Sequence, residues 1–411
     1  RRLRLRYALR ALRPLLMALP FEKLAVVVCA GSGPAEVGRS HGVQLRERIA
    51  AVLDLYFSRF DALGLSPDEV RAWGEGYRRE VSALAPALAE EIAAIAAGAG
   101  RADWELFALN ARSEILAHAL RVSSQSLPNE CTALFCAASA LLAQNWDWDA
   151  AFDSLPVLLR IARSDTRLQV LTMTEPGMLA KAGFNDRGVG VCLNALVGSE
   201  PAAAPVGLPV HCLLRLALSC DSLDQAHAAL RGAARHCSCH ILLADSIGQY
   251  RSLELNGTSL ESAATDPTAH DIGEEFPIEG EMLPPPPPTV VAHTNHYLHH
   301  RFEAMHVGRD DWHTRERYQR ALEIASEWDA KTGGASGTVH QLALVKSILG
   351  DRAGAPRSIL YEGAQGIVPG VSSVATICSV IMDLRELRMQ VTRGSALSQD
   401  YVQVPLLGAN L

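Results

Sequence analysis

The chain has 411 residues, of which 48% are hydrophobic and 20% are charged, and its formal net charge at pH 7 is −7. This is the composition of a globular protein with a large core, and the length allows one large domain or about two to three smaller ones. The negative charge argues against nucleic acid as a partner, and no apolar run reaches the ~18 residues that a membrane-spanning helix needs.

The N-terminal segment, residues 1–20, is rich in arginine and contains no acidic residue. Leu5, Leu9, Leu12 and Leu16 recur at helical spacing, which predicts an amphipathic surface helix. The alternative is a transit peptide, because such segments are rich in arginine and poor in acids. We expect a cytoplasmic location. The peroxisome or another organelle is the alternative, since residues 409–411 are reminiscent of a Ser-Lys-Leu signal but lack its basic residue.

Nine cysteines are spread along the chain. A disulfide framework is not expected, because the chain is long and carries no convincing secretion signal. Several cysteines, among them Cys29, Cys192 and Cys378, lie in strand-like runs, where buried thiols behave as small hydrophobes. This cysteine usage favours a reducing compartment.

The predicted elements change in kind along the chain. Residues 24–29 predict a buried strand, and helical periodicity dominates residues 42–120, with residues 86–97 as the clearest helix. Beyond residue 130 the pattern becomes one of short strands and turns. Strands are expected at residues 168–174, 188–193, 238–245, 250–255, 290–295 and 374–383, and helices at 208–218, 222–232 and 314–328. Strand runs interrupted by helices predict an α+β fold of stacked antiparallel sheets covered by helices.

Cys131 stands at the head of a strand-like run over residues 130–135, and a second run closes on Gln-Asn-Trp-Asp-Trp at residues 144–148. The return strand would bring Asp147 back beside Cys131, and a thiol near a carboxylate suits nucleophilic catalysis. If the bond between Glu130 and Cys131 breaks, Cys131 gains a free α-amine. Its reference pKa of about 7.7–8.0 lets it serve as a base near neutral pH.

These residues resemble the acyl-coenzyme A:6-aminopenicillanate acyltransferase family, the C45 peptidases, which are N-terminal-nucleophile (Ntn) enzymes. Further matches follow in the family's order at residues 110–115, 174–178, 190–194 and 293–296. The resemblance implies the four-layer αββα sandwich of the Ntn class. It also implies self-cleavage between Glu130 and Cys131, which gives an N-terminal segment 1–130 and a catalytic segment 131–411.

The resemblance implies roles for individual side chains. Asp147 would orient the nucleophile and its amine, because a carboxylate beside an ammonium raises the pKa of the amine. Asn295 is the first candidate for the donor to the oxyanion of acyl transfer, and Asn194 is the second. Trp146 and Trp148 alternate around Asp147 and are expected to pack between the sheets or line the acyl pocket.

The chain departs from the family pattern at three places. Ala143 stands where glycine usually precedes the Gln-Asn-Trp-Asp segment, and Glu130 stands where the penicillin-making enzyme has glycine before its nucleophile. The active-site arginine of the family has no clear match near its usual strand, so Arg317 or Arg320 is the candidate. These departures leave the substrate open rather than the type of reaction.

Histidines and cysteines gather in residues 236–240, and histidines gather again in residues 293–300, which raises the alternative of a metal site. The chain has no Cys-x₂-Cys pair and no His-Glu-x-x-His motif, so a metal site is disfavoured. It also has no Gly-x-Ser-x-Gly elbow, which argues against a Ser–His–Asp hydrolase.

The sequence therefore predicts a self-processing Ntn cysteine amidohydrolase or acyltransferase, which cleaves or transfers acyl groups on amide bonds through an acyl-thioester on Cys131. The expected partners are a small-molecule amide or acyl donor and the two chains cut from one precursor. No cofactor is expected, and acyl-coenzyme A is a possible co-substrate. The alternative is a non-catalytic or metal-binding protein on the same scaffold, in which Cys131 is never exposed.

Overall fold

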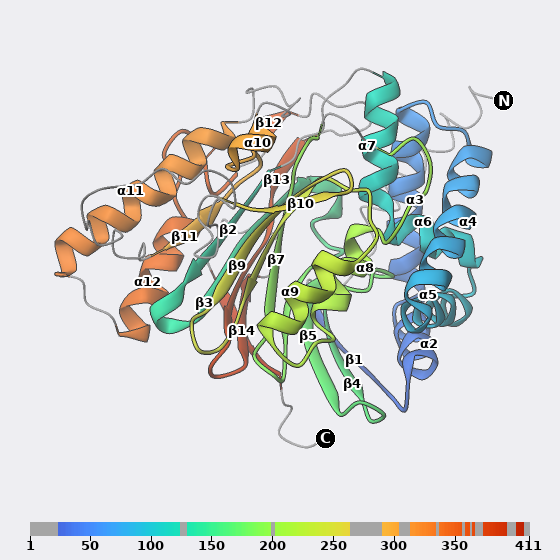
Figure 1. Cartoon of the computed structure of the whole chain (residues 1–411), viewed down its shortest axis with the longest axis horizontal. Helices are drawn as coiled ribbons and strands as arrows, with labels where there is room; N and C mark the ends of the chain where they lie inside the picture. Colours follow the sequence, from blue (N-terminus) through green and yellow to red (C-terminus); the bar gives the residue numbers. More distant parts are fainter. Residues whose placement is uncertain are drawn as a thin grey trace, which may run out of the picture.

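The computed structural model describes residues 24–123, 130–198, 202–263, 290–303, 313–333, 337–355, 358–361, 364–365, 373–392 and 400–406. The helix expected over residues 1–20 lies outside the described residues. Figure 1 shows strands in the middle of the molecule and helices on both sides of them.

The first sheet contains most of the strands between residues 25 and 262. Its order is β1 (Ala25–Gly31), β4 (Val157–Arg163), β5 (Leu168–Thr174), β6 (Ala182–Asn185), β7 (Gly190–Ala195), β8 (Cys239–Ala244), β9 (Tyr250–Asn256) and β10 (Ser259–Ser262). Neighbours pair in antiparallel fashion except at the edge, where β1 runs parallel to β4. The N-terminal part of the chain thus contributes an edge strand to a sheet built mainly from later residues.

The second sheet contains the strand that begins at Cys131. Its order is β11 (Val291–His293), β2 (Glu130–Cys136), β3 (Leu141–Asp149), β13 (Ser373–Asp383), β14 (Arg388–Thr392) and β15 (Tyr401–Pro405), and β12 (Ala364–Gln365) also pairs with β13. The short 3₁₀ turn Ala137–Ser139 joins β2 to β3 and ends at Ala140, whose φ of 53° is left-handed. This hairpin places the two runs predicted around Cys131 and Asp147 side by side.

Adjacent residues of β3 show how the layers stack. The Gln144 side chain donates to the Leu193 carbonyl of β7 at 2.6 Å and so faces the first sheet. The Asn145 side chain points the other way and donates to the Leu349 carbonyl at 2.9 Å, at the end of the outer helix α12 (Thr338–Leu349). Successive side chains of a strand point to opposite faces, so one strand contacts both neighbouring layers.

Helices cover the outer face of each sheet (Figure 1). On the second sheet lie α11 (Thr314–Thr332) and α12, with the short α10 (His300–Glu303) nearby. The first sheet is flanked by α2 (Pro34–Gln44), α3 (Arg46–Ala62), α4 (Pro67–Leu84), α5 (Pro86–Ala99), α6 (Asp103–Asn110), α7 (Arg112–Ser123), α8 (Val210–Ala217) and α9 (Leu223–Gly232). The order of layers is therefore α, β, β, α, and the predicted α+β sandwich is confirmed.

Local sequence signals set several of these boundaries. Ser66 caps α4 through a capping box with Glu69, and Pro86 occupies the first turn of α5. Gly100 ends α5 in the left-handed region at φ 69°, which glycine adopts without a steric penalty. The helix predicted for residues 86–97 is thus confirmed and runs slightly further.

One predicted strand is shorter than expected. Residues 290–295 read as a single strand, but β11 covers only Val291–His293. The next two residues bond to the start of α11 instead. Thr294 Oγ1 donates to the Thr314 carbonyl at 2.9 Å, and the Asn295 N–H donates to Thr314 Oγ1 at 2.7 Å. These bonds turn the chain out of the sheet and carry Asn295 toward Cys131.

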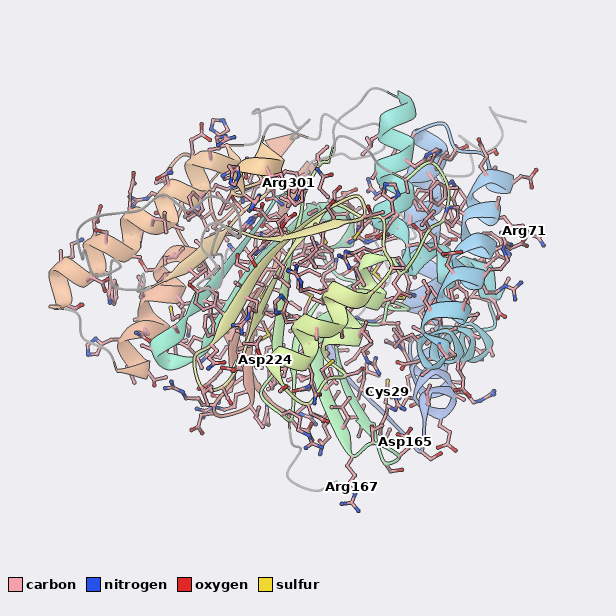
Figure 2. The ribbon with its side chains drawn as sticks, in the orientation of Figure 1. Cys29, Arg71, Asp165, Arg167, Asp224 and Arg301 are labelled. Atoms are coloured by element: carbon pink, nitrogen blue, oxygen red, sulfur yellow. The ribbon has the colours of Figure 1, made fainter. Side chains whose placement is uncertain are left out.

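Charged side chains lie mainly at the periphery. Arg71 projects from an outer helix, and Asp165 and Arg167 project from the turn between β4 and β5 (Figure 2). The space between the sheets is filled by buried apolar side chains of both, such as Phe135, Leu142 and Val191. None of the helices within the described ranges is long and apolar enough to cross a membrane.

Candidate active site

Cys131 lies near the start of β2, directly opposite Trp146 on β3, and Glu130 is opposite Asp147. Partners opposite each other share a face of the sheet, so Cys131 and Trp146 face the first sheet. Asp147 belongs to the other face, on the side of the outer helices. The Cys131 side chain is only 7% exposed in the uncut chain. The predicted pairing of thiol and carboxylate therefore spans the two faces of one hairpin.

The main-chain carbonyl of Cys131 is held by two donors. Asn194 Nδ2, at the end of β7, donates to it at 3.0 Å, and Arg317 Nη1, on α11, donates to it at 3.1 Å. Arg317 Nη1 also donates to Thr132 Oγ1 at 3.1 Å. Of the two candidate arginines, Arg317 reaches the site, whereas Arg320 bonds to Asp351 on the surface side of the helix.

The main-chain nitrogen of Cys131 is held by Asn295. The Cys131 N–H donates to Asn295 Oδ1 at 2.7 Å, and Arg317 Nη2 donates to the same oxygen at 3.0 Å. Asn295 Nδ2 donates to the Ala195 carbonyl at 2.9 Å. An amide nitrogen carries two hydrogens, so this described bond uses one of them. Both predicted asparagines thus contact the backbone of the predicted nucleophile or lie beside it.

Asp147 is buried and only partly hydrogen-bonded. Its Oδ1 accepts from the hydroxyl of Thr376, which is its neighbour in register on β13. Its Oδ2 is buried and has no hydrogen-bond partner among the described residues. Burial raises the pKa of Asp147 to about 7, although Arg317 and the Thr376 bond act in the opposite direction. The carboxyl group therefore changes charge close to neutral pH.

We expect Asp147→Asn to change the pH dependence of stability. In an uncut Cys131→Ala background, the Asp147 carboxyl keeps a proton between pH 3.8 and about 7 that the unfolded chain releases. The free energy of unfolding must fall as pH rises through this window. Asparagine does not titrate. The free energy of unfolding of the Asp147→Asn protein, relative to that of the protein with Asp147, should therefore increase from pH 4 to 7 by up to roughly 4 kcal/mol and then level off.

Urea unfolding of the two proteins at several pH values measures this difference. A difference that is independent of pH would show that Asp147 ionises as freely in the folded protein as in the unfolded chain.

Because the two side chains are nearly isosteric, Asp147→Asn alone should keep the fold and slow self-cleavage or turnover by misorienting the Cys131 amine.

The thiol of Cys131 is not ionised in the uncut chain at neutral pH. Burial and the nearby Asp147 charge raise its pKa to about 11, while the Asp147 backbone, Lys181 and Arg317 act to lower it. A thiolate is the reactive form of cysteine, so attack needs a base or a change of environment. Release of the α-amine at Cys131 would supply such a base.

Lys181 is a buried residue of this site that the sequence analysis did not identify. Its Nζ lies 3.2 Å from the centroid of the Trp146 ring and 2.6 Å from Glu175 Oε2. Glu175 also accepts from the Tyr56 hydroxyl at 2.5 Å and pairs with Arg112 at 3.2 Å. Lys181 and Arg112 share one carboxylate, so the cluster behind Trp146 has a net positive charge when Lys181 is protonated.

The ionisation of this cluster follows from its partners. Burial opposes the charge on Glu175, but Lys181 and Arg112 overcome it and lower the pKa of Glu175 to about 2. Burial lowers the pKa of Lys181 to about 7 despite the attraction of Glu175. A sequence signal for Lys181 exists, since it is a lone charge in an apolar run over residues 178–184.

Lys181→Met is expected to slow alkylation of the Cys131 thiol below about pH 7, where Lys181 is protonated and its positive charge favours the thiolate. The rate of alkylation by iodoacetamide, followed by intact mass across pH, should be lower than in the wild type below about pH 7 and should converge with it above. Lys181→Arg keeps the charge and serves as the matched control. Equal profiles for the methionine variant and the wild type would mean that the Lys181 charge does not reach the thiol.

Trp148 lies two residues further along β3 and packs against the N-terminal helices. Its ring is 6.5 Å from that of Tyr56 on α3, and the Arg112 guanidinium lies 4.9 Å from its centroid. Trp146 is therefore the tryptophan directly opposite Cys131, whereas Trp148 contacts the helical layer that precedes residue 130.

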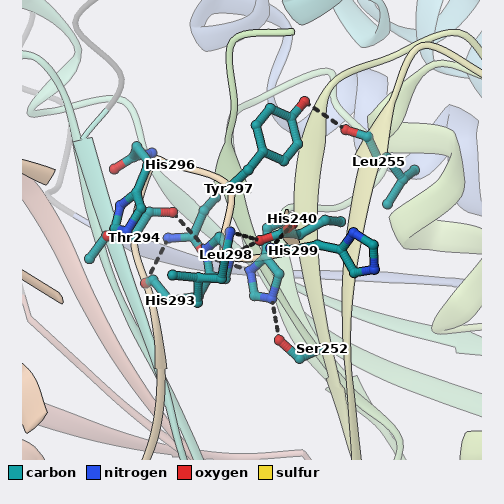
Figure 3. A network of polar contacts seen from close by, with 12 residues as sticks. His240, Ser252, Leu255, His293, Thr294, His296, Tyr297, Leu298 and His299 are labelled. Carbon is teal, nitrogen blue, oxygen red and sulfur yellow. Dashed lines mark hydrogen bonds and ion pairs between the residues drawn. The ribbon is translucent and has the colours of Figure 1, made fainter. Parts of the chain in front are cut away.

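Histidines of the two clusters, among them His240, His293 and His296, are buried and hydrogen-bonded. No group of three or more His, Cys, Asp or Glu side chains in the described part of the chain is arranged to hold a metal ion. His240 and His293 instead stack with ring centroids 3.5 Å apart (Figure 3). All nine cysteines lie within the described part, and each is a free thiol.

Comparisons with known proteins give one family model and several relatives that are similar to this chain. The family model described as acyl-coenzyme A:6-aminopenicillanic acid acyl-transferase matches residues 136–397. The 40 kDa form of acyl-coenzyme A:6-aminopenicillanic-acid-acyltransferase from Emericella nidulans is 30% identical over 249 residues. That match covers 58% of this chain and 66%, just under two thirds, of the relative's length.

Two solved structures are more distantly similar. A mutant conjugated bile acid hydrolase from Clostridium perfringens gives a TM-score of 0.42 at 13% identity, over 67% of this chain and 92% of that one. Penicillin V acylase from Agrobacterium tumefaciens gives a TM-score of 0.39 at 13% identity, over 67% of this chain and 86% of that one.

Proposed function

Because this chain belongs to the acyl-coenzyme A:6-aminopenicillanic acid acyltransferase family, we propose that it is a self-processing acyltransferase or amidohydrolase with Cys131 as its nucleophile. The observation that carries the proposal is the convergence of Asn194, Asn295 and Arg317 on the backbone of one buried cysteine. These residues come from separate elements and hold both the nitrogen and the carbonyl of Cys131.

Processing begins with the Cys131 thiol attacking the carbonyl carbon of Glu130. The peptide bond to the Cys131 nitrogen breaks, that nitrogen takes up a proton, and Glu130 becomes a thioester on the Cys131 sulfur. Water then cleaves the thioester and leaves a carboxylate on Glu130 and a free thiol and amine on Cys131. The positive charges of protonated Lys181 and of Arg317 favour the thiolate that starts this sequence.

The two fragments are expected to stay together. Strand β1 precedes the cut and pairs with β4, which follows it, over seven residues from Ala25 to Gly31. Buried residues of the N-terminal helices, such as Tyr56 and Ile115, share one apolar cluster with Phe135 and Trp146. Separating segments 1–130 and 131–411 would expose this cluster to water, which is unfavourable by about 25 cal/mol per Å² of apolar surface.

In turnover, the freed α-amine takes the thiol proton and the thiolate attacks an acyl carbonyl. The remaining hydrogen on Asn295 Nδ2 is the proposed donor to the resulting oxyanion. The leaving group departs as an amine from an amide, or as coenzyme A from an acyl-coenzyme A donor, and an acyl-thioester remains on Cys131. Water or an amine then takes the acyl group and restores the thiol. The proposal leaves both kinds of acceptor open.

A chemically activated ester tests the proposed intermediate without knowledge of the natural substrate. The cut protein is mixed with p-nitrophenyl hexanoate, and the mass of each fragment is measured after quenching in acid. We expect a hexanoyl adduct on fragment 131–411 that neutral hydroxylamine removes, because hydroxylamine cleaves thioesters. An adduct that resists hydroxylamine, or that lies on fragment 1–130, would contradict the proposed role of Cys131.

A further inference from the structure

We propose that His240 is a positioning residue, which locks the Asn194 amide onto the main-chain carbonyl of Cys131. The proposal rests on the proposed function of Cys131 and extends it to a buried network behind the site. His240 lies on β8, opposite Asn194 in the register of β7 and β8. No described contact joins His240 or its partner His293 to the thiol, and their described link to Cys131 passes through Asn194.

The orientation of Asn194 follows from its acceptors. Asn194 Nδ2 donates to the Cys131 carbonyl at 3.0 Å and to the His293 carbonyl at 3.3 Å. Two carbonyl oxygens can only accept, so the nitrogen of the amide must face them. The amide oxygen Oδ1 then faces His240 Nδ1 at 2.9 Å. Both hydrogens of Asn194 are committed, which distinguishes it from Asn295.

The hydrogen position on His240 follows from Asn194. Since Oδ1 of Asn194 accepts, His240 Nδ1 must carry the hydrogen and donate it. Burial and the adjacent His293 hold the pKa of His240 well below its ordinary value, so the ring carries a single hydrogen. His240 Nε2 is then an acceptor, and Ser252 Oγ, 2.9 Å away, donates to it. Figure 3 shows this contact between His240 and Ser252.

His293 supports His240 from one face. The two rings are nearly parallel, with an interplanar angle of 6°. Both nitrogens of His293 face acceptors, because Nδ1 is 2.8 Å from the Thr294 carbonyl and Nε2 is 2.8 Å from Glu254 Oε1. Glu254 also accepts from the backbone N–H groups of Leu298 and His299. The stacked pair is thus anchored to Glu254 and cannot rotate without breaking buried hydrogen bonds.

A function in positioning follows from this chain of contacts. Glu254 holds His293, His293 packs on His240, and His240 fixes the Asn194 amide that holds the Cys131 carbonyl. Flipping the Asn194 amide would point its oxygen at two carbonyl oxygens and release the nucleophile. Acyl transfer depends strongly on the placement of the attacking atom, and a misplacement of about 1 Å can cost about 10²-fold in rate. His240 therefore sets how well Cys131 is aimed.

Two similar substitutions separate donation at Nδ1 from simple filling of space. In His240→Asn, the amide nitrogen can occupy the position of Nδ1 and still donate to Asn194. In His240→Gln, the amide lies further along the side chain, near the position of Nε2, and the donor to Asn194 is lost. We expect His240→Asn to acylate within about threefold of wild type and His240→Gln to acylate about tenfold or more slowly.

The measurement uses the full-length chain after self-cleavage, and rates are expressed per cut molecule determined by intact mass. Acylation is followed with p-nitrophenyl hexanoate, and alkylation of the same thiol with iodoacetamide provides an internal reference. Alkylation needs only a reachable thiolate, whereas acylation also needs correct aim at the carbonyl and the oxyanion donor. The ratio of acylation to alkylation should fall for His240→Gln and be kept for His240→Asn.

Several outcomes would overturn the proposal. The proposal is wrong if His240→Asn and His240→Gln give the same ratio of acylation to alkylation, either at the wild-type level or reduced by the same factor. Such a result would show that donation from Nδ1 does not affect acylation. If either variant fails to cut, Ser252→Ala replaces it, because this change removes only the hydroxyl that donates to Nε2. Ser252→Ala should lower the ratio severalfold, and an unchanged ratio would contradict the proposal. Failure of the proposed function is distinct, since Cys131→Ala would then still form the adduct.

Discussion

Cys131→Ala is expected to yield an uncut 411-residue chain that forms no acyl adduct. The thiol is the proposed nucleophile of both self-cleavage and turnover, and alanine removes it without adding volume to a buried position. No thioester can form at residue 131 without the sulfur, so both self-cleavage and acylation should fall below detection. Intact mass after purification reports cutting, and the p-nitrophenyl hexanoate assay reports acylation.

A second cysteine provides the matched control for this experiment. Cys220 is a half-buried thiol that bonds to the Leu216 carbonyl at the end of α8, and no described contact joins it to Cys131. Cys220→Ala should cut and acylate like the wild type. If acylation disappears in Cys220→Ala and survives in Cys131→Ala, the nucleophile is Cys220, and the proposed role of Cys131 is wrong.

Asn295→Ala is expected to slow acylation of the cut protein by about 10²–10³-fold, equivalent to roughly 2.7–4 kcal/mol of lost transition-state stabilisation. Thiolate attack places a full charge on the carbonyl oxygen, and the unused hydrogen of Asn295 Nδ2 is the proposed donor to it. The rate is measured in a single turnover on the cut fraction, so that slower processing is not mistaken for slower chemistry.

Two further variants sharpen this test. Asn295→Asp keeps an oxygen that can accept from the Cys131 nitrogen but removes the donor, so it should be impaired about as much as the alanine variant. Asn194→Ala should cost less, about tenfold, because the carbonyl of Cys131 keeps its bond to Arg317. If Asn295→Ala acylates as fast as wild type, the oxyanion donor is a backbone amide, or Asn194 after it releases one of its two carbonyl acceptors.

The hairpin around Cys131 was predictable from sequence because the residues that form it are close together in the chain. The apolar run after residue 130 and the run before residue 148 are joined by a short turn, so their pairing brings Asp147 opposite Glu130. The layered fold was predictable for a similar reason, since strand and helix patterns alternate in blocks. The motif order then pointed to Asn194 and Asn295, which the fold brings to the main-chain carbonyl and the main-chain nitrogen of Cys131.

The rest of the site depends on contacts that no local pattern encodes. Lys181 reaches Trp146 because β6 and β3 belong to facing sheets, and sequence reasoning did not connect the two. The histidines at 240 and 293 look like metal ligands in a linear reading. In the structure their rings stack, and Asn194 contacts both the His293 carbonyl and the His240 ring. Tertiary register therefore decides what these side chains do.

The end of strand β11 also depends on tertiary contacts that the local sequence does not encode. The β-propensity of residues 290–295 predicts a strand through Asn295, but Thr314 at the start of α11 offers hydrogen bonds that compete with the sheet. A helix start located 19 residues downstream of Asn295 ends the strand. The early end of β11 is what lets the Asn295 side chain turn toward the Cys131 nitrogen.

The most direct test of this account is the intact mass of the purified wild-type protein, combined with N-terminal sequencing of each species. The account predicts two associated fragments, residues 1–130 and 131–411, and the second must begin Cys-Thr-Ala-Leu-Phe with a free amine. A single full-length chain that acylates at the wild-type rate with the Cys131 nitrogen still in its peptide bond would contradict the account. A full-length chain without any activity would instead support the alternative of a non-catalytic protein on the same scaffold.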